Sequence, residues 1–579
     1  MVARTGYAEK DVADYDIRNI KTDISLHYKI RPNTILSYTY RFAELNNVYQ
    51  RANRFTLSDY VLQQHALEIR SGLFQARAFV TSEDTGNSYN LRSAAENLDR
   101  RFKPDADWYE DFTSAFNQAS NQGLSTQMAL ATARNVADAG RFQPGTTEFR
   151  QALRSLTGIN DWDRGAALRV KDLLVHAEAQ IDLLKTFGGN ETTHALQFLA
   201  GADYQSYIIK PDGNYFINPT AADRFSTFTY GKTGGFVQGG STIFEGRLKL
   251  SATMRVDKND YFEATFNPRI SAVLSPSARQ SIRASFQSGS RFPSIFEAFS
   301  NVNSGGVRRV GGLRIMSDGV FENGYFRSSV DRFQTAVTNA FNGGSSIEEA
   351  IQDNRSLLVK NTYSYLRPEQ IKSLEVGYKA ILFDATLKFD ADFYFNRYKN
   401  FIAQIELNVP QTENPNLIPA YLNDRSLQDR YRIYTNSQSV VYNYGASAGL
   451  TFQILPGYSA SANVAYAKLS RTDSGDGFED GFNTPEWSGN VSFTVENICK
   501  TLSFTTTYKR QSSFYWRSFL ANGSVEAYGT LDAQANYELL KSKINVKIGA
   551  TNIFNAYYNS YLGAPAVGGF YYSTIVYEL

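Results

Sequence analysis

Alternation of apolar and polar residues is the feature that most constrains what this chain can form. The segment 384–396 reads DATLKFDADFYFN, with Leu387 and Phe389 on one face and Asp390 and Asp392 on the other. Successive side chains of a β-strand point to opposite faces, so this pattern predicts a strand with one apolar and one polar face. We find about 19 such segments along the chain. They lie near 16–29, 34–44, 60–70, 72–82, 168–185, 194–205, 228–238, 244–256, 265–275, 279–289, 370–380, 384–399, 440–454, 457–469, 486–496, 500–513, 525–540, 543–553 and 570–579.

The connections between these segments alternate between short and long. The short ones are turn sequences such as Arg31-Pro32-Asn33 and Pro456-Gly457, because proline presets φ while glycine and asparagine accept positive φ. Alternate connections of an up-and-down meander lie at opposite ends, so we expect tight turns at one end and long loops at the other. Only the connection 257–264 is short where a long one is expected. The long ones are 45–59, 83–167, 206–227, 290–369, 400–439, 470–485, 514–524 and 554–569.

This asymmetry is typical of an all-β transmembrane antiparallel β-barrel of the outer-membrane type, with short turns inside and long extracellular loops. The apolar faces would contact lipid and the polar faces a wet lumen. The 37 Tyr and 40 Phe would then form girdles at the two interfaces. No run of about 18 apolar residues occurs, which excludes a transmembrane helix. The alternative is a soluble sandwich or propeller, which predicts shorter strands or a repeat of about 40–50 residues that we do not find.

Composition argues against several other functions. The formal net charge of +2 gives no electrostatic reason to expect nucleic acid as a partner. The single Cys499 excludes an intrachain disulfide framework and a cysteine-based zinc site. The four histidines are scattered over different predicted strands, and no HExxH, GxSxG or Cys-His arrangement occurs. We therefore predict neither an enzyme nor a cofactor. An outer-membrane enzyme, whose residues would converge only in space, is a less favoured alternative.

Several stretches carry a resemblance to a known family. They are RFPSIFEAF at 291–299, LRPEQIKSLEVGYK at 366–379, GATNIFNAYY at 549–558 and the aromatic final strand. In this order they resemble the barrel of TonB-dependent outer-membrane receptors, and residues 4–11 and 53–65 extend the resemblance over the whole chain. The resemblance implies a multi-pass barrel in the cell outer membrane of a Gram-negative bacterium. It also implies TonB-dependent active uptake of a scarce bulky nutrient, such as an iron chelate, cobalamin or an oligosaccharide.

Receptors of this family have about 22 strands around an N-terminal plug. Counting back from the last strand, we expect residues 1–579 to be an incomplete C-terminal barrel domain, with no plug and with about three first strands missing. The N-terminus shows no signal-peptide pattern. Gly568-Gly569 stands where Gly-Arg is often seen, and Leu579 replaces the usual terminal Phe. The change at Leu579 could weaken recognition by the barrel insertion machinery.

The resemblance also implies a set of partners. These are outer-membrane lipid, the TonB complex through the missing plug, the barrel insertion machinery, a small or medium-sized nutrient ligand and a possible surface lipoprotein. Besides the receptor, a plugless porin-like channel or a surface-binding barrel is a second hypothesis for the function.

The two longest loops, 83–167 and 290–369, are the expected place of ligand binding, because loops beyond about 12–15 residues are usually functional or disordered. Apolar residues at spacings of three and four predict short helices in both loops. Trp108, Tyr109 and Trp162 could stack on a sugar or an aromatic chelate. The alternative is that these three side chains form a small core of the loop itself.

Charged residues on the predicted lumen face are the second set of candidate ligand contacts. Both signs are present, so the set favours neither an anionic chelate nor a neutral glycan. The set comprises Arg247, Lys249, Lys388, Asp390 and Asp392.

An acidic loop is a weak candidate for a metal site. Its carboxylates, on Asp473, Asp476, Glu479 and Asp480, could supply oxygen ligands to calcium. Glycines interrupt the spacing that an EF-hand requires, so a solvated loop is the favoured interpretation.

Overall fold

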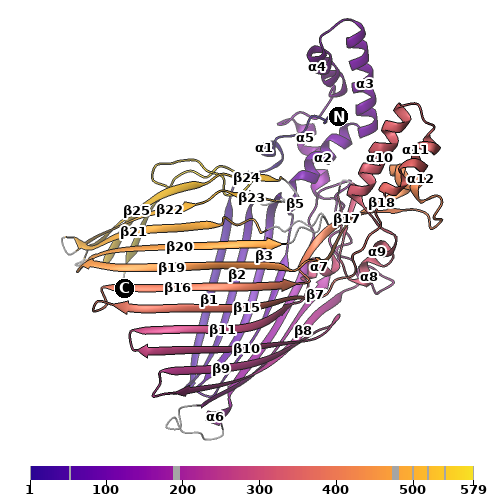
Figure 1. Cartoon of the computed structure of the whole chain (residues 1–579). Coiled ribbons are helices and arrows are strands. Elements are labelled where there is room, and N and C mark those ends of the chain that lie inside the picture. Colours follow the sequence, from indigo (N-terminus) through magenta and orange to yellow (C-terminus); the bar gives the residue numbers. More distant parts are fainter. Residues whose placement is uncertain are drawn as a thin grey trace.

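The computed structural model describes residues 2–50, 54–186, 196–304, 306–471, 482–498, 501–517, 521–539 and 543–577. One large sheet dominates the molecule (Figure 1). Its main strands are β1 (Arg18–Arg31), β2 (Thr34–Gln50), β3 (Arg54–Ser71), β4 (Phe74–Asp84), β6 (Lys171–Asp182), β7 (Leu196–Lys210), β8 (Phe228–Ile243), β9 (Leu248–Asn259), β10 (Phe262–Ser277), β11 (Gln280–Arg291), β15 (Glu369–Leu382), β16 (Leu387–Lys399), β19 (Val441–Leu455), β20 (Tyr458–Arg471), β21 (Trp487–Ile498), β22 (Leu502–Gln511), β25 (Tyr528–Leu539), β26 (Ile544–Thr551) and β27 (Phe570–Tyr577). The short strand β5 (Tyr89–Asn90) pairs with the start of β3 and completes a 20-stranded sheet.

Each main strand pairs in antiparallel fashion with the next main strand along the chain. The register is regular over long stretches, as in β15 and β16, which pair from Gln370↔Lys399 to Leu382↔Leu387. Strands β1 and β27 are the two edges of the sheet, and each has one pairing partner among the described residues. The predicted all-β antiparallel meander is confirmed.

The two ends of the sheet differ. Tight turns close one end, at the left and bottom of Figure 1, while the helices other than α6 gather at the top and right. The β19–β20 turn shows why such a turn needs glycine. Gly457 has φ +82°, and a Cβ atom there would come within 2.9 Å of the carbonyl oxygen of Glu496, so only glycine fits without strain. Short turns force neighbouring strands to lie side by side, which leaves the long connections together at the opposite end.

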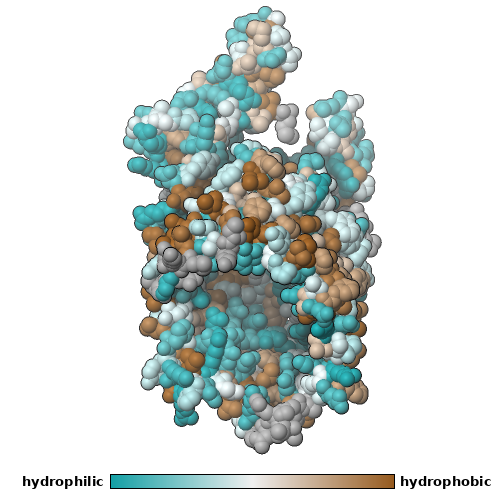
Figure 2. Space-filling view, turned by 90° about the vertical axis from the view of Figure 1, so that its left-hand side faces the viewer, coloured by the Kyte–Doolittle hydropathy of each residue, from teal (hydrophilic) through white to brown (hydrophobic). Residues whose placement is uncertain are grey.

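In the middle of the strands the alternating pattern places apolar side chains outside and charged ones inside. Leu26 and Tyr28 on β1 are 65% and 68% exposed, which is far from their usual burial in a folded protein. The sheet curls around a hollow whose visible walls are mostly hydrophilic (Figure 2). On its inner face Arg283 of β11 forms ion pairs with Asp390, at 3.4 Å, and with Asp392. An inside-out distribution of this kind suits a sheet surrounded by lipid.

The long connections hold nearly all of the helices. The β4–β6 connection contains α2 (Leu91–Phe102), α3 (Asp105–Asn121), α4 (Thr126–Ala137) and α5 (Thr147–Thr157). The β11–β15 connection contains α7 (Ile295–Phe299), α8 (Arg314–Ser317), α9 (Val320–Asn323), α10 (Arg327–Asn342), α11 (Ile347–Asn354) and the 3-10 helix η2 (Arg355–Leu357). The others are α1 (Glu9–Val12), α6 (Leu183–Thr186), α12 (Ile418–Asn423) and the 3-10 helix η3 (Arg425–Leu427). No helix within the described ranges combines the length and the apolar character needed to cross a membrane.

A second sheet stands over the loop end of the large one. It consists of β12 (Asn301–Ser304), β13 (Val307–Val310), β18 (Gln428–Asn436), β17 (Ile402–Pro410) and β14 (Tyr325–Phe326), in that order. A two-stranded sheet of β23 (Phe514–Trp516) and β24 (Gly523–Val525) lies in another connection. We expected 400–439 only as a long loop, whereas the structure places β17 and β18 within it. This extra sheet brings the β11–β15 and β16–β19 connections together.

The buried core lies among the long connections. One cluster joins Phe299 of α7 to Tyr230 of β8, and another joins Leu407 of β17 to Ile433 of β18. The strands of the large sheet contribute to this core only near their loop ends, because elsewhere their side chains face either outward or into the hollow. The packed connections therefore form a rigid platform over one end of the hollow.

Candidate ligand-binding site

Two cavities lie among the long connections. The first, which we call the arginine cleft, has a volume of about 590 Å³. Its lining includes Arg54, Arg92, Arg309, Arg327, Arg430 and Arg432. The second, which we call the mouth cavity, has a volume of about 820 Å³ and lies where the strands of the large sheet meet the connections. Cavities of this size suit a bulky small-molecule ligand.

The second sheet forms one wall of the arginine cleft. Arg430 and Arg432 are two residues apart on β18, so their side chains share a face, while Ile433 points to the other face and is fully buried. Strand β13 pairs in parallel with β18, with Arg309 opposite Arg432. Two neighbouring strands therefore bring three guanidinium groups to one wall.

The N-terminal segment and α2 form the opposite wall. The hydroxyl of Tyr7 donates a hydrogen bond to the carbonyl oxygen of Phe142 at 3.0 Å, and the guanidinium of Arg141 lies 3.6 Å from the centre of the Tyr7 ring. Val12 packs in one cluster with Leu98 of α2. These contacts fix the segment before β1 against the β4–β6 connection.

Glu406 of β17 is the charged centre of the cleft wall. Its carboxylate accepts hydrogen bonds from Arg327 at 2.7 Å and from the Nε of Arg432 at 3.0 Å. Burial by itself would raise the pKa of Glu406, but the hydrogen bonds and positive charges of Arg432 and Arg327 outweigh it and hold that pKa below its ordinary value. The carboxylate therefore stays ionised and neutralises only part of the surrounding charge.

The cleft carries an excess of positive charge. Burial lowers the pKa of Arg309, and the like charge of Arg432 lowers it further. Burial also lowers the pKa of Arg430, and the nearby positive charges of Arg425 and Arg327 lower it further. An anion in the cleft would relieve this repulsion. The carboxylates that line the cleft are already paired, Glu9 with Arg54, Glu96 with Arg92, Asp99 with Arg141, and Glu406 with Arg327 and Arg432.

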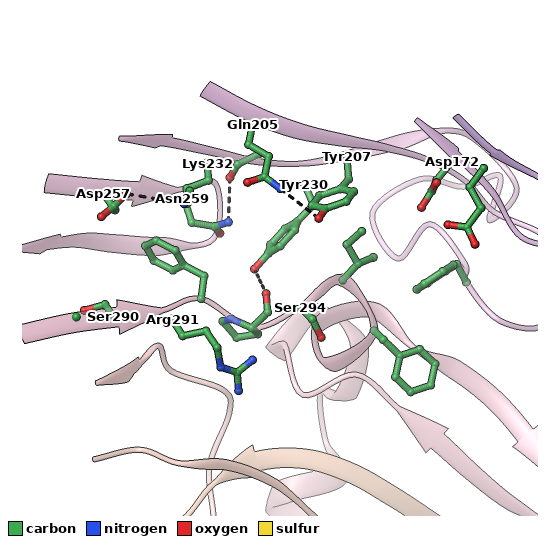
Figure 3. A pocket seen from close by; sticks show the side chains of 18 of the residues that line it. Asp172, Gln205, Tyr207, Tyr230, Lys232, Asp257, Asn259, Ser290, Arg291 and Ser294 are labelled. Atoms are coloured by element: carbon green, nitrogen blue, oxygen red, sulfur yellow. Dashed lines mark hydrogen bonds and ion pairs between the residues drawn. The ribbon is translucent and has the colours of Figure 1, made fainter. Parts of the chain in front are cut away.

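The mouth cavity is lined by polar ends of barrel strands and by a roof segment. Figure 3 shows Tyr207 and Tyr230 near its centre, with Asp172 towards one side and Asp257 towards the other. Gln205 donates a hydrogen bond to the hydroxyl of Tyr207 at 3.1 Å. The cavity thus offers hydroxyl, amide and carboxylate groups around one space, which can orient a ligand of mixed polarity.

The roof of the mouth cavity is the RFPSIFEAF stretch, which forms α7 and the residues before it. Ser294 caps α7 and exchanges hydrogen bonds with Glu297 in a capping box. Arg291 holds Glu297 at 2.8 Å and Glu369 of β15 at 2.9 Å, which ties the roof to the large sheet. Tyr230 donates to the carbonyl oxygen of Pro293 at 2.6 Å. The roof is therefore held on both sides.

Aromatic rings separate the two cavities. Trp162 lines the cleft, and its ring lies 6.0 Å from that of Tyr215, which lines the mouth cavity. Tyr215 in turn lies 4.9 Å from Phe296 of the roof. Burial raises the pKa of Tyr215 to about 12, so its hydroxyl stays protonated. Asp212 fixes the backbone at Tyr215 by accepting a hydrogen bond from its N–H at 3.0 Å.

The structure separates the three aromatic residues that the sequence singled out. Trp108 is fully buried and stacks on Phe112 with ring centres 5.2 Å apart. Tyr109 is 42% exposed, and its hydroxyl donates to the carbonyl oxygen of Val2 at 2.9 Å. Only Trp162 lines the cleft, where its indole N–H donates to Ala167 at 2.8 Å. The role of all three in ligand binding stays a prediction.

The predicted lumen residues lie on the wall of the hollow, away from both cavities. Arg247 and Lys249 belong to the β8–β9 turn and the start of β9, at the short-turn end. Lys388, Asp390 and Asp392 lie on β16. Their contact with ligand also stays a prediction. The acidic group Asp473, Asp476, Glu479 and Asp480 lies outside the described residues. Within the described part of the chain, no cluster of three or more His, Cys, Asp or Glu side chains could hold a metal ion.

The sequence analysis did not identify the arginines of β13 and β18 as candidate site residues. Arg430-Tyr431-Arg432-Ile433 alternates like a strand, so the pattern could have revealed β18. The neighbouring Arg309 comes from β13, far away in the sequence, and only the pairing of the two strands brings them together.

Comparison with known proteins supports the same architecture. A family model described as "TonB dependent receptor-like, beta-barrel" matches residues 11–555. The chain belongs to this family. It is therefore a β-barrel protein of the outer membrane, and its family consists of transport receptors that bind nutrient ligands and work with TonB. No curated protein matches the chain by sequence.

Solved structures of family members share the fold at low sequence identity. The siderophore receptor PirA from Pseudomonas aeruginosa is 12% identical, with a TM-score of 0.52 over 96% of this chain and 69% of that chain. A mutant of the ferric enterobactin receptor PfeA from Pseudomonas aeruginosa is 13% identical, with a TM-score of 0.57 over 96% and 69%. The copper transporter OprC is 12% identical, with a TM-score of 0.55 over 97% and 72%.

Proposed function

We propose that this receptor takes up a bulky anionic nutrient, with a negatively charged iron chelate as the best candidate. The observation that supports this is the arginine cleft, whose guanidinium groups outnumber its carboxylates and adjoin the mouth cavity. Charge-assisted hydrogen bonds from arginine are strong and suit carboxylate or phenolate oxygens. A neutral oligosaccharide would leave the excess charge uncompensated. Two of the similar structures are named as receptors for a siderophore or for ferric enterobactin.

The geometry suggests an order of events. The ligand first meets Arg309 and Arg430 in the cleft, and then passes the aromatic rings of Trp162 and Tyr215 into the mouth cavity. The hydrophilic hollow below would receive it. In the same proposal, residues 1–579 act as the C-terminal barrel domain of the receptor. The receptor contacts TonB through a plug.

Substitution of Arg430 tests the ligand class. Binding of ferric enterobactin, cobalamin and maltoheptaose to the purified chain in detergent is followed by quenching of tryptophan fluorescence. We expect the ferric chelate to bind, and Arg430→Gln to weaken it by about tenfold or more, because hydrogen bonds to charged groups contribute about 1.5–3 kcal/mol. Arg279→Gln is the matched control, since Arg279 pairs with Asp384 at the short-turn end. Binding of the glycan without the chelate would contradict the proposed ligand.

Uptake in cells separates a receptor from a porin-like channel. Cells that express residues 1–579 joined to an N-terminal plug should accumulate the ferric chelate only when the TonB complex is functional. Equal accumulation in cells lacking TonB would indicate passive diffusion through the barrel, and would overturn the receptor even if the cleft binds the chelate.

A further inference from the structure

The outer wall of the sheet from β11 to β22 has charges of one sign only. Leu374 of β15 and Phe393 of β16 are nearly half exposed and mark the outward face. Residues directly opposite each other in an antiparallel pair share a face, so the registers extend this assignment over β11, β15, β16, β19, β20, β21 and β22. Every charged residue on this outward face is basic. They are Lys372, Arg397, Lys399, Lys468 and Arg510.

These basic residues all lie at the loop end of their strands. Lys372 is the fourth residue of β15, while Arg397 and Lys399 close β16. Charges on the lipid face of a barrel are tolerated near the interfaces and costly at the centre of the bilayer. The position of the basic residues therefore places them at the outer surface of the membrane.

Lys372, Arg397 and Lys399 form a compact group, which we call the basic trio. Lys372 stands directly opposite Arg397, and Lys399 is two residues further along the same face. Like charges opposite each other destabilise a strand pair. In the ranges that the structure describes, no carboxylate forms an ion pair with any of the three, whereas Lys468 pairs with Glu486 at 3.5 Å. Among the described residues, the basic trio therefore has no protein counter-charge.

An aromatic band lies on the same face next to the basic trio. The rings of Phe395 and Tyr442 are 5.7 Å apart, and those of Tyr466 and Trp487 are 4.6 Å apart. Tyrosine and tryptophan favour the level of the lipid headgroups. Arg397 stands directly opposite Tyr442, and Lys399 is two residues nearer the loop end, so the trio lies at the loop-end border of this band, close to the level of lipid phosphates.

A shallow apolar depression continues this face across β19–β22. It has a volume of about 740 Å³, and Leu450, Val464 and Val491 line it, with Arg510 at its edge. Small residues such as Ala448 and Ala462 create the space. An acyl chain would fill such a depression, since its surface is chiefly hydrocarbon.

We propose that this outer wall holds a phosphate-bearing lipid of the outer leaflet. The basic trio binds its phosphate, and its acyl chains lie over the aromatic band and the apolar depression. The lipid phosphate supplies the counter-charge that the described residues do not provide, since basic groups at a membrane surface attract anionic lipid. This site is independent of the imported nutrient, because it lies outside the barrel.

Native mass spectrometry of the chain in non-ionic detergent tests this site. The probes are dioleoyl phosphatidic acid, dioleoyl phosphatidylcholine and inorganic phosphate. We expect retention of phosphatidic acid well above that of phosphatidylcholine. The triple variant Lys372→Gln, Arg397→Gln, Lys399→Gln should weaken retention of phosphatidic acid at least fivefold.

The matched control removes the same number of charges from the inner face. Lys29, Lys379 and Lys547 occupy the lumen-facing rows of β1, β15 and β26, so their joint replacement by Gln should leave retention unchanged. A heat-dependent shift in gel mobility confirms that both variants fold. Equal retention by the outer variant and the native chain would overturn the proposal. The proposal would also be overturned if the inner variant lost as much retention of phosphatidic acid as the outer variant. Binding of inorganic phosphate in preference to the lipid would overturn it too.

Discussion

At the scale of single residues, environment decides what a side chain can do. Trp108 and Trp162 lie in the same connection, but one is enclosed between helices and the other borders a charged cleft. Glu406 and the arginines around it show the same dependence. An isolated surface ion pair contributes little, whereas Glu406 is shared by Arg327 and Arg432 and is half-buried. These residues hold the cleft wall in one arrangement.

Acidification should loosen this wall. The pKa of Glu406 in the folded chain lies below the ordinary value of 4.5. Its contribution to stability is therefore fully present above about pH 4.5 and is lost as the pH falls through the lower folded pKa. We expect hydrogen exchange of β17 and β18, corrected for intrinsic rates, to be constant between about pH 7 and pH 5 and to rise below pH 4.5.

The variant Glu406→Gln is the control for this pH effect. It should exchange faster at neutral pH, because Arg327 and Arg432 lose their common partner, and it should lack the rise at low pH. A rise of equal size in the variant would show that other carboxylates cause the loosening.

At the scale of elements, short pieces connect the loop platform to the barrel. Helix α7 has only five residues, too few to be stable alone, and owes its form to its cap and to burial of Phe299. The 291–299 stretch that carries the family resemblance is thus the roof of the mouth cavity. In this stretch Phe299 packs in the buried core, and Arg291 anchors the loop to the large sheet.

Loss of the α7 cap should affect ligand binding. Ser294→Ala removes the side chain that accepts from Glu297, at a cost of about 1 kcal/mol in local stability. We expect faster exchange at 295–299 and weaker binding of the ferric chelate. Ser346→Ala removes an equivalent capping box in α11, away from both cavities, and serves as the control. If both variants changed chelate binding equally, the roof would have no special role.

At the scale of the whole molecule, the barrel and its loop platform follow opposite rules. Away from the loop end, the wall from β11 to β22 exposes large apolar residues and keeps its charges inside, whereas the platform buries its apolar residues in several clusters. This difference follows from the solvent on each side of the wall. Lipid surrounds the barrel, and water surrounds the connections.

Neighbouring residues in the middle of β10 offer a test of this arrangement. Ile270 is 61% exposed on the outward face, and Ser271 faces inward, where its hydroxyl bonds that of Ser251. Ile270→Arg should lower the free energy of unfolding in lipid vesicles by about 2–4 kcal/mol, since arginine near the bilayer centre is costly. Ser271→Arg should change it much less. Guanidinium titration read by gel mobility measures both, and an equal effect would argue against lipid contact at Ile270.

The sequence by itself determined the strands and their order. A period of two is a local property, so alternation reveals a strand without knowledge of its partners, as in 384–396. The alternating lengths of the connections then fixed the meander and its two unlike ends. The same reasoning missed β17 and β18, because both strands lie inside a connection whose length indicates a loop.

Only the tertiary structure decided which charges meet. Arg309 and Arg432 are far apart in the sequence, and their approach depends on a parallel strand pair between two connections. The basic trio likewise depends on the register of β15 and β16, because a shift of one residue would turn Lys372 or Arg397 into the lumen. Local patterns determine which face a residue occupies, and long-range pairing determines its neighbours there.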